Sequence, residues 1–357
     1  MKRFLLQFGA ISLVFLLLCT VLSSLTYSER FIMYKTLDTP YKKVAWNLSL
    51  IEKHPERLKN STVFLGSSLV QGAIQDSLLQ ANNIPALNMA VPHNGNDLNL
   101  YFFERIMPYN PKKIFWLKGK VPYTGLHKLT PLLYKPAGLL SKGQGLNSSF
   151  IRYFFKRVKL SMEFIGFQLF QGEWKPSSSE QAFLNRPYGY IIAPGALDSE
   201  VFASYQQKSN SRTDEYFNLY LNEFKYQKEL GEGGIGHTVQ YWKRKLVHQG
   251  YLKSNFLRNV GAQEAFVSQA LAQGQENQIE LTKLYVPLLV DAFDYSQVSY
   301  KRSFYQNTKT DAEVPVYSLN EFSFLSRADL WSDEDHVNEE GAFLFTNALI
   351  QARIFEQ

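Results

Sequence analysis

The sequence predicts an α/β protein built on a parallel sheet. Apolar runs of strand character alternate with segments of helical spacing, first over residues 62–117 and again over residues 263–355. Short connections between such segments are typical of parallel strands joined by helices. With 357 residues, of which 45% are hydrophobic, the chain can bury a large core. We expect one α/β domain formed by two separated stretches, 61–124 and 251–357.

The N-terminus carries a long apolar segment. Lys2 and Arg3 precede twenty-two uncharged residues, 4–25. This length suits one membrane span, and the two basic residues favour a cytoplasmic N-terminus. We therefore expect a transmembrane signal-anchor over residues 1–25 with the rest of the chain extracytoplasmic; a cleaved signal peptide is the alternative. Residues 26–60, interrupted by Pro40 and Pro55, are expected to form a linker with one short helix over 41–54.

The first half of the sheet is predicted over residues 62–117. Strands are predicted at residues 62–65, 86–91 and 114–117, because these apolar runs are bounded by turn residues. Helices are predicted between them at 73–79 and 98–106.

The second half resumes with a helix at 263–272 and strands at 279–286 and 314–319. Pro287 closes the first of these strands, since proline cannot donate to a strand ladder. A helix over 340–355 ends the pattern.

The middle of the chain, residues 125–250, interrupts the alternation and predicts a mostly helical insertion or cap. Residues 148–170 place apolar side chains on one face, with Arg152, Lys156 and Lys159 on another. Such a helix either lies at a membrane interface or packs on the core. Residues 213–230 form another expected helix.

Gly66-Ser67-Ser68 follows the first strand and opens a helical segment. A serine hydroxyl at a helix N-terminus lies beside backbone N–H groups that stabilise an oxyanion, as acyl transfer requires. Ser68 is therefore the candidate nucleophile. The alternative is that Ser67 or Ser68 only caps the helix.

Asp333 precedes His336 by three residues in a loop just before the last helix. A serine nucleophile needs a base, and the base needs a carboxylate that fixes its tautomer. One loop can supply both, although a solvated polar loop is the alternative. We expect His336 to be the base and Asp333 its orienting group.

Together, Gly66-Ser67-Ser68 and Asp333-x-x-His336 resemble the SGNH (GDSL-like) hydrolase superfamily. More particularly, the chain is similar to the membrane-anchored, extracytoplasmic acyltransferase-like branch that includes alginate O-acetylation and teichoic acid D-alanylation proteins. The resemblance covers roughly residues 60–120 and 276–355. It implies a three-layer α/β/α, flavodoxin-like domain, with Ser68 as nucleophile and Asp333 and His336 as its partners.

The second and third blocks of that family are less regular here. Residues 88–97 predict a loop at the same sheet edge, where the family places a glycine N–H in the oxyanion hole. Here His93 or Asn94 occupies the position of that glycine, with Gly95 next, and we expect these residues to form the oxyanion hole with Ser68. The family's Gly-x-Asn-Asp is replaced by Lys118-Gly-Lys-Val-Pro. Either Asn94 or Asn96 substitutes for the missing asparagine, or the protein is slow or inactive.

The net charge and the motifs of the sequence limit the classes of function that it can have. The net charge is +6 without a long basic run, which disfavours nucleic acid, and no phosphate loop or metal-ligand cluster is apparent, so neither cofactor nor metal is expected. We expect serine-dependent acyl (acetyl) transfer to, or removal from, hydroxyls of a cell-surface polysaccharide. The resemblance implies a polytopic membrane O-acyltransferase partner. The alternative is a non-catalytic glycan-binding or scaffolding component, and a secreted esterase would follow from a cleaved N-terminus.

Overall fold

The computed structural model describes residues 2–93, 95–118, 126–142, 148–171, 174–193, 195–203, 256–289, 316–317, 323–333 and 335–355. The predicted helix at 213–230 lies outside these residues, and so do Asn94 and the third block beyond Lys118.

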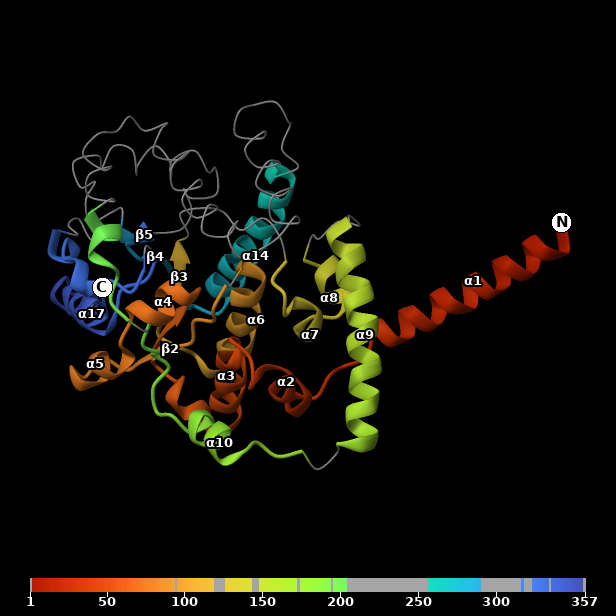
Figure 1. Ribbon diagram of the computed structural model, residues 1–357, viewed down its shortest axis with the longest axis horizontal. Helices are drawn as coiled ribbons and strands as arrows, with labels where there is room; N and C mark the ends of the chain where they lie inside the picture. The colour runs from red at the N-terminus through yellow and green to blue at the C-terminus, as the bar shows by residue number, and fades with distance from the viewer. Residues whose placement is uncertain are drawn as a thin grey trace.

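Among the described residues, one sheet contains five strands in the order β2-β1-β3-β4-β5, and every neighbouring pair is parallel (Figure 1). The strands are β1 (Thr62–Leu65), β2 (Ala86–Asn88), β3 (Lys113–Lys118), β4 (Glu280–Tyr285) and β5 (Val316–Tyr317). This is a doubly wound order, in which ligand sites lie beyond the carboxyl ends of the strands. The predicted α/β class with a parallel sheet is confirmed.

Helices make up most of the remaining described chain. The α-helices are α1 (Lys2–Ser23), α2 (Glu29–Thr36), α3 (Lys42–Lys53), α4 (Ser68–Ala73), α5 (Asp76–Ala81), α6 (Asn96–Ile106), α7 (Thr130–Leu133), α8 (Pro136–Leu140), α9 (Ser148–Phe170), α10 (Ser178–Leu184), α14 (Phe256–Glu276) and α17 (Glu339–Gln351). Short 3-10 turns occur at Pro55–Arg57, Met107–Tyr109, Ser323–Leu325 and Ala328–Leu330.

The core lies on both faces of the sheet, because successive strand side chains point to opposite sides. Val63 and Leu65 belong to one buried cluster, whereas Phe64 belongs to another. Among the helices, α3, α6 and α14 contribute residues to the first cluster, together with α2 and α7 to α9, whereas α4, α5 and α17 contribute to the second. Two helical layers thus enclose the sheet, consistent with a three-layer α/β/α arrangement.

Three local predictions are wrong. Instead of one helix at 73–79, the chain forms α4 and α5, because the carbonyls that end α4 accept hydrogen bonds from Asn88. The strand predicted at 86–91 ends at Asn88, two residues after it begins. Residues 26–60 are not a linker, because α2 and α3 bury Phe31, Val44 and Trp46 in the first cluster. The short helix predicted at 41–54 does form, as α3.

The described part of the mid-chain segment is helical, as expected, and contains α7 to α10. Its longest helix, α9, lies on the side of the body away from α17 (Figure 1), where it packs against α1 and α7. The last described part of the segment, by contrast, reaches the loop that carries Asp333 and His336, where the Leu197 N–H donates to the Trp331 carbonyl at 2.7 Å.

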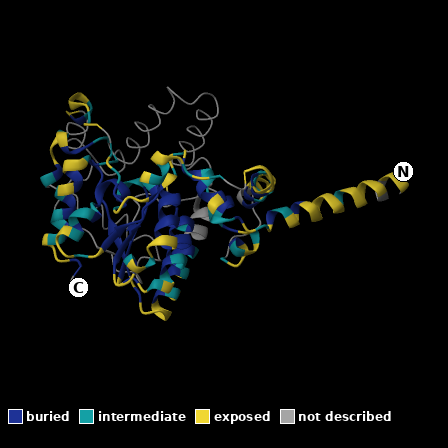
Figure 2. Ribbon diagram, turned by 90° about the horizontal axis from the view of Figure 1, so that it is seen from below, coloured by how far each residue is buried: buried dark blue, intermediate teal, exposed yellow. Residues whose placement is uncertain are grey.

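The helix α1 forms over the predicted membrane segment and projects from the body, exposed along most of its length (Figure 2). Within the described part of the chain, no helix has both the length and the apolarity needed to cross a membrane. The membrane span predicted over residues 4–25 thus gains no support from this criterion.

Candidate active site

The turn after β1 separates the roles of the two serines. Ser67 is the N-cap of α4, and its side chain accepts a hydrogen bond from the Leu69 N–H at 3.3 Å. Ser68 is the first helical residue, where the backbone N–H has no intrahelical acceptor. Gly66 brings this turn close to β3, since an added Cβ would lie 2.8 Å from the Leu117 Cβ. Capping therefore falls to Ser67, and the Ser68 hydroxyl points elsewhere.

The second part of the site is a tight loop between Trp331 and Val337. These two residues form an antiparallel bridge, and the Ser332 N–H donates to the His336 carbonyl at 2.9 Å. Trp331 is fully buried, and its indole N–H donates to the Leu325 carbonyl at 2.7 Å. The bridge closes the loop so that the Asp333 and His336 side chains face each other.

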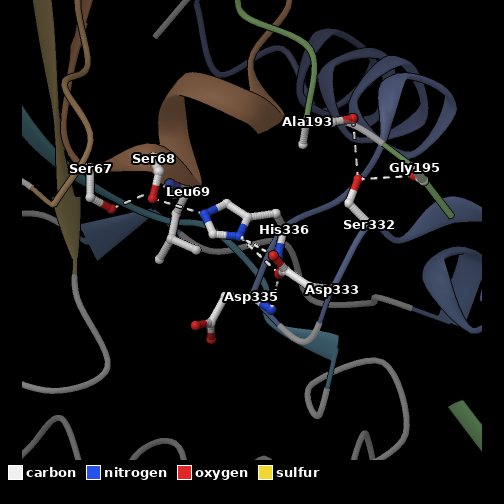
Figure 3. Close-up of polar contacts among 9 residues, drawn as sticks. All are labelled: Ser67, Ser68, Leu69, Ala193, Gly195, Ser332, Asp333, Asp335 and His336. Atoms are coloured by element: carbon white, nitrogen blue, oxygen red, sulfur yellow. Dashed lines mark hydrogen bonds and ion pairs between the residues drawn. The ribbon is translucent and has the colours of Figure 1, made fainter. Parts of the chain in front are cut away.

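The three predicted catalytic residues meet (Figure 3). His336 Nε2 lies 2.8 Å from Ser68 Oγ, and His336 Nδ1 lies 2.8 Å from Asp333 Oδ1 and 3.0 Å from Oδ2. A carboxylate can only accept, so Nδ1 carries the proton and Nε2 accepts from the Ser68 hydroxyl. The His336 side chain is 24% exposed and Ser68 is half-buried, so both reacting residues are partly open to solvent.

Asp333 is held in its ionised form. Burial pushes its pKa upward, but the hydrogen bond and charge of His336 and the N–H groups of Asp335 and His336 outweigh burial and leave the pKa below its ordinary value. Both N–H groups donate to Asp333 Oδ1 at 2.8 Å. The carboxylate is thus fixed in position and charge beside the imidazole.

Contacts between α4 and α17 fix the distance from the serine to the histidine. Thr346 of α17 donates its hydroxyl to the Ala73 carbonyl at 3.1 Å and accepts from the Gln75 N–H at 3.0 Å. The Gln75 side chain donates to the Glu339 carbonyl at 2.9 Å. The two chain segments that carry Ser68 and His336 are therefore joined just behind the site.

The second block runs alongside the serine turn. The Met89 N–H donates to the Phe64 carbonyl at 3.0 Å, and the Val91 N–H donates to the Gly66 carbonyl at 2.9 Å. Farther along the same block, His93 is exposed and has a positive φ of 51°, and Gly95 is the buried N-cap of α6. Since Asn94 lies outside the described residues, the oxyanion role of this loop stays a prediction.

Two buried residues that sequence reasoning gave no role hold the second block in place. The Asn88 side chain donates to the Val70 and Ile74 carbonyls at 3.0 and 2.8 Å. Asp76 accepts from the Asn88 N–H at 3.0 Å and from the Gly189 N–H at 2.7 Å. The signal available was a polar residue, Asn88, inside the predicted apolar strand 86–91, but its partners are set by the tertiary fold.

Asp97 links the second block to the chain that follows the third. Its carboxylate accepts from the His127 N–H at 2.8 Å and from the Thr130 hydroxyl at 2.5 Å. Burial raises the pKa of Asp97 and lowers that of His127 to about 4. The His127 ring is therefore neutral at physiological pH, and the pair serves to anchor the loop.

An open hollow of about 620 Å³ lies beside the loop of Asp333 and His336. Ser332 donates to the carbonyls of Ala193 and Gly195, which lie on its wall (Figure 3). The hollow is lined by Gln75, Ile192, Ala193, Gly195, Asp329, Asn338, Glu339, Glu340 and Phe343. Ser68 and His336 are not among the lining residues, so the hollow adjoins the reacting groups and does not contain them.

The arrangement supplies a hydroxyl nucleophile, a base in the required tautomer and an ionised carboxylate, which are the parts of acyl transfer through serine. Among the described residues, no group of three or more His, Cys, Asp or Glu side chains is placed to hold a metal ion. In comparisons with known proteins, neither a family model nor a curated protein matches this chain.

Proposed function

We propose that this protein is an SGNH-like serine acyltransferase or esterase that acts on ester-linked acetyl groups of an extracytoplasmic polysaccharide. The observation that carries the proposal is the hydrogen-bonded series Ser68, His336 and Asp333. The resemblance of the blocks around these residues to the membrane-anchored acyltransferase-like branch of that superfamily supports the class of reaction. The choice of polysaccharide as substrate rests on the same resemblance.

The reaction proceeds in two halves. Ser68 Oγ attacks the acyl carbonyl carbon while its proton passes to His336 Nε2, which forms a tetrahedral oxyanion. The oxyanion collapses, and His336 returns the proton to the leaving alkoxide, so an acyl-serine remains. An acceptor hydroxyl then gives its proton to His336 and attacks the acyl group, and as the second tetrahedral intermediate collapses, the departing Ser68 oxygen takes that proton back from His336. A sugar acceptor makes the reaction a transfer, and water makes it a hydrolysis.

The oxyanion is assigned to backbone donors. The Ser68 N–H is available at the first position of α4. His93 adopts a left-handed φ of 51°, a conformation that glycine adopts without steric cost. This backbone supports the idea that His93 stands where the resembling family has its glycine, and that its N–H, rather than its ring, completes the hole.

The hollow beside the loop suits part of a longer acceptor. Its walls carry the carboxylates of Glu339 and Glu340, whose oxygens can accept hydrogen bonds from sugar hydroxyl groups. Phe343 offers an apolar surface to the face of a sugar ring. A neighbouring sugar would rest there while the reacting hydroxyl reaches Ser68.

The cellular setting is part of the proposal. The uncharged segment 4–25 behind Lys2 and Arg3 favours attachment to a membrane with the catalytic domain outside the cytoplasm. A polytopic O-acyltransferase that passes acyl groups across the membrane would supply the donor, as the resemblance implies.

The test is turnover of 4-nitrophenyl acetate by the full chain. We expect a burst of nitrophenol followed by slower turnover, and a loss of about 10⁶-fold in kcat in Ser68→Ala. Ser67→Ala is the matched control, because Ser67 caps the helix and does not contact His336 through any described hydrogen bond. Methyl glucoside is then added as an acceptor. Its acetylated form among the products would identify transfer rather than hydrolysis. A folded parent with neither burst nor turnover would leave the glycan-binding or scaffolding alternative.

A further inference from the structure

A long apolar stripe on α9 lies exposed at the surface. Its side chains follow one another at intervals of four, three, four, three and four residues, which keeps them on one face of a helix with about 3.6 residues per turn. The stripe consists of Ile151, Phe155, Val158, Met162, Ile165 and Leu169. Apart from the partly buried Val158, these side chains are 41% to 71% exposed, and Phe170 at the helix end is 85% exposed.

The opposite face of α9 is fixed to the body. Tyr153 and Phe167 are buried there in the first core cluster, and the Tyr153 hydroxyl donates to the Tyr134 carbonyl at 2.6 Å. The core is thus complete without the stripe, and a second, independent apolar face remains. A patch of this length on a helix marks an interaction surface.

The helix α1 is joined to α9 by a buried polar cluster. Arg157 donates to the carbonyl of Ser23, the last residue of α1, to that of Leu25 just beyond it, and to that of Pro131 at 2.6 Å. Ser161 donates to the Leu22 carbonyl at 2.5 Å. These bonds satisfy carbonyls that a helix end leaves unpaired, and they hold α1 in a fixed position against α9.

The junction places two apolar surfaces on one side of the molecule. Figure 1 and Figure 2 both show α1 leaving the body beside α9 and pointing away from the sheet, across rather than along α9. The stripe also points away from the sheet, because Tyr153 and Phe167 on the other face point into the body. Most large side chains of α1, from Phe4 to Val21, are more than half exposed.

The charges beside the stripe match an anionic lipid surface. Arg152, Lys156 and Lys159 are exposed and share one flank of α9 between the stripe and the buried face. Lys159 is 81% exposed, and its nearest carboxylate, that of Glu163, is 4.0 Å away and is also paired with Lys35 at 3.0 Å. Basic side chains bordering an apolar helical face are typical of helices that lie in a bilayer interface.

From these contacts we propose that α9 is an interfacial helix, which lies flat in the boundary between the headgroups and acyl chains of a bilayer that α1 enters. The basic flank meets the headgroups, and the Arg157 junction holds the catalytic body at a fixed height and orientation above the lipid. This inference rests on the membrane location proposed above and adds to it the surface by which the body sits on the membrane.

The test measures the surroundings of single labels in the full chain. The only cysteine, Cys19, is replaced by alanine, and a nitrobenzoxadiazole label is attached in turn at Phe155→Cys, Met162→Cys and, as the matched control on the far side of the body, Asn82→Cys. The proteins are reconstituted into vesicles of phosphatidylcholine and phosphatidylglycerol. Quenching is measured with a lipid that carries a nitroxide on its acyl chain and, separately, with iodide in the water.

We expect the nitroxide lipid to quench the labels at 155 and 162 at least about threefold more strongly than the label at 82, with the opposite order for iodide. Iodide quenching at 162 in vesicle-bound protein would overturn the proposal, since the stripe would then face water. Protection from both quenchers would overturn it in favour of a protein partner or a second copy, and protein that stays free of the vesicles would refute the membrane location as well. Nitrophenyl acetate turnover in the same samples reports on Ser68 independently, so failure of the proposed chemistry is distinguishable from failure of docking.

Discussion

Replacing Asp333 with asparagine removes one charge while keeping the shape of the side chain. In the parent, Asp333 Oδ1 accepts from the N–H groups of Asp335 and His336, and both carboxylate oxygens lie within 3.0 Å of His336 Nδ1. The asparagine oxygen keeps the backbone N–H groups, so its NH₂ faces Nδ1. His336 must then accept at Nδ1 and carry its proton on Nε2, where it no longer accepts from Ser68.

The expected loss follows from this tautomer. A serine triad whose aspartate becomes asparagine loses about 10⁴-fold in kcat. At about 1.36 kcal/mol per factor of ten, this is about 5.4 kcal/mol of transition-state stabilisation. Stability changes far less, by under about 1 kcal/mol, because the Asp333 side chain is 42% exposed and solvent screens its interaction with His336.

The pH dependence of stability has a definite sign. The pKa of Asp333 is depressed in the folded protein, so its contribution is fully present above the unfolded value of about 3.9 and is lost as pH falls through the lower folded pKa. Asp333→Asn removes this dependence, which unfolding in denaturant at acid and neutral pH would measure.

The assay is the kcat for 4-nitrophenyl acetate, with Asp335→Asn as control. Asp335 lies in the same loop and contacts Asp333 through its backbone N–H, which the substitution keeps. The kcat of this control should therefore stay within about threefold of the parent value. An Asp333→Asn variant that keeps more than about a tenth of the parent kcat would refute the assigned tautomer.

Three further predictions test the parts around the site. Ser67→Ala removes the cap of α4 and should lower the free energy of unfolding by about 1 kcal/mol while turnover persists; unchanged stability would argue against the cap. His93→Gly should keep kcat within about threefold, since a backbone N–H is the assigned donor, and a much larger loss would implicate the ring. Gly341→Ala places a Cβ 2.3 Å from the Leu330 carbonyl oxygen and should cost about 1 to 3 kcal/mol, seen as a lower Tm; an unchanged Tm would contradict the close packing there.

The strands and the three catalytic candidates were predictable because their signals are local. Parallel strands enclosed by helices are continuous apolar runs, and β1, β3 and β4 begin or end within about a residue of the predicted bounds. Asp333 and His336 share one loop, so three residues of sequence already bring them together. Ser68 is far from them in the sequence, but it follows a strand of the parallel sheet, and the carboxyl ends of such strands share one edge.

The rest depends on contacts between distant segments. The end of α4 at Ala73 is set by the side chain of Asn88, which no window around residue 73 contains. The helix α2 was missed because its eight residues are too few for a clear period, although Phe31 is fully buried. The division of roles between Ser67 and Ser68 also required the structure, because either serine could cap a helix at that turn.

Labelling of the full chain with a fluorophosphonate, followed by mass mapping of the modified peptide, tests the central claim most directly. Ser68, activated by His336 at 2.8 Å, is the predicted site of the phosphonyl adduct. The adduct should disappear in Ser68→Ala, weaken strongly in His336→Ala and persist in Ser67→Ala. An unlabelled but folded parent, or an adduct that remains in Ser68→Ala, would contradict the assignment of Ser68 as the nucleophile.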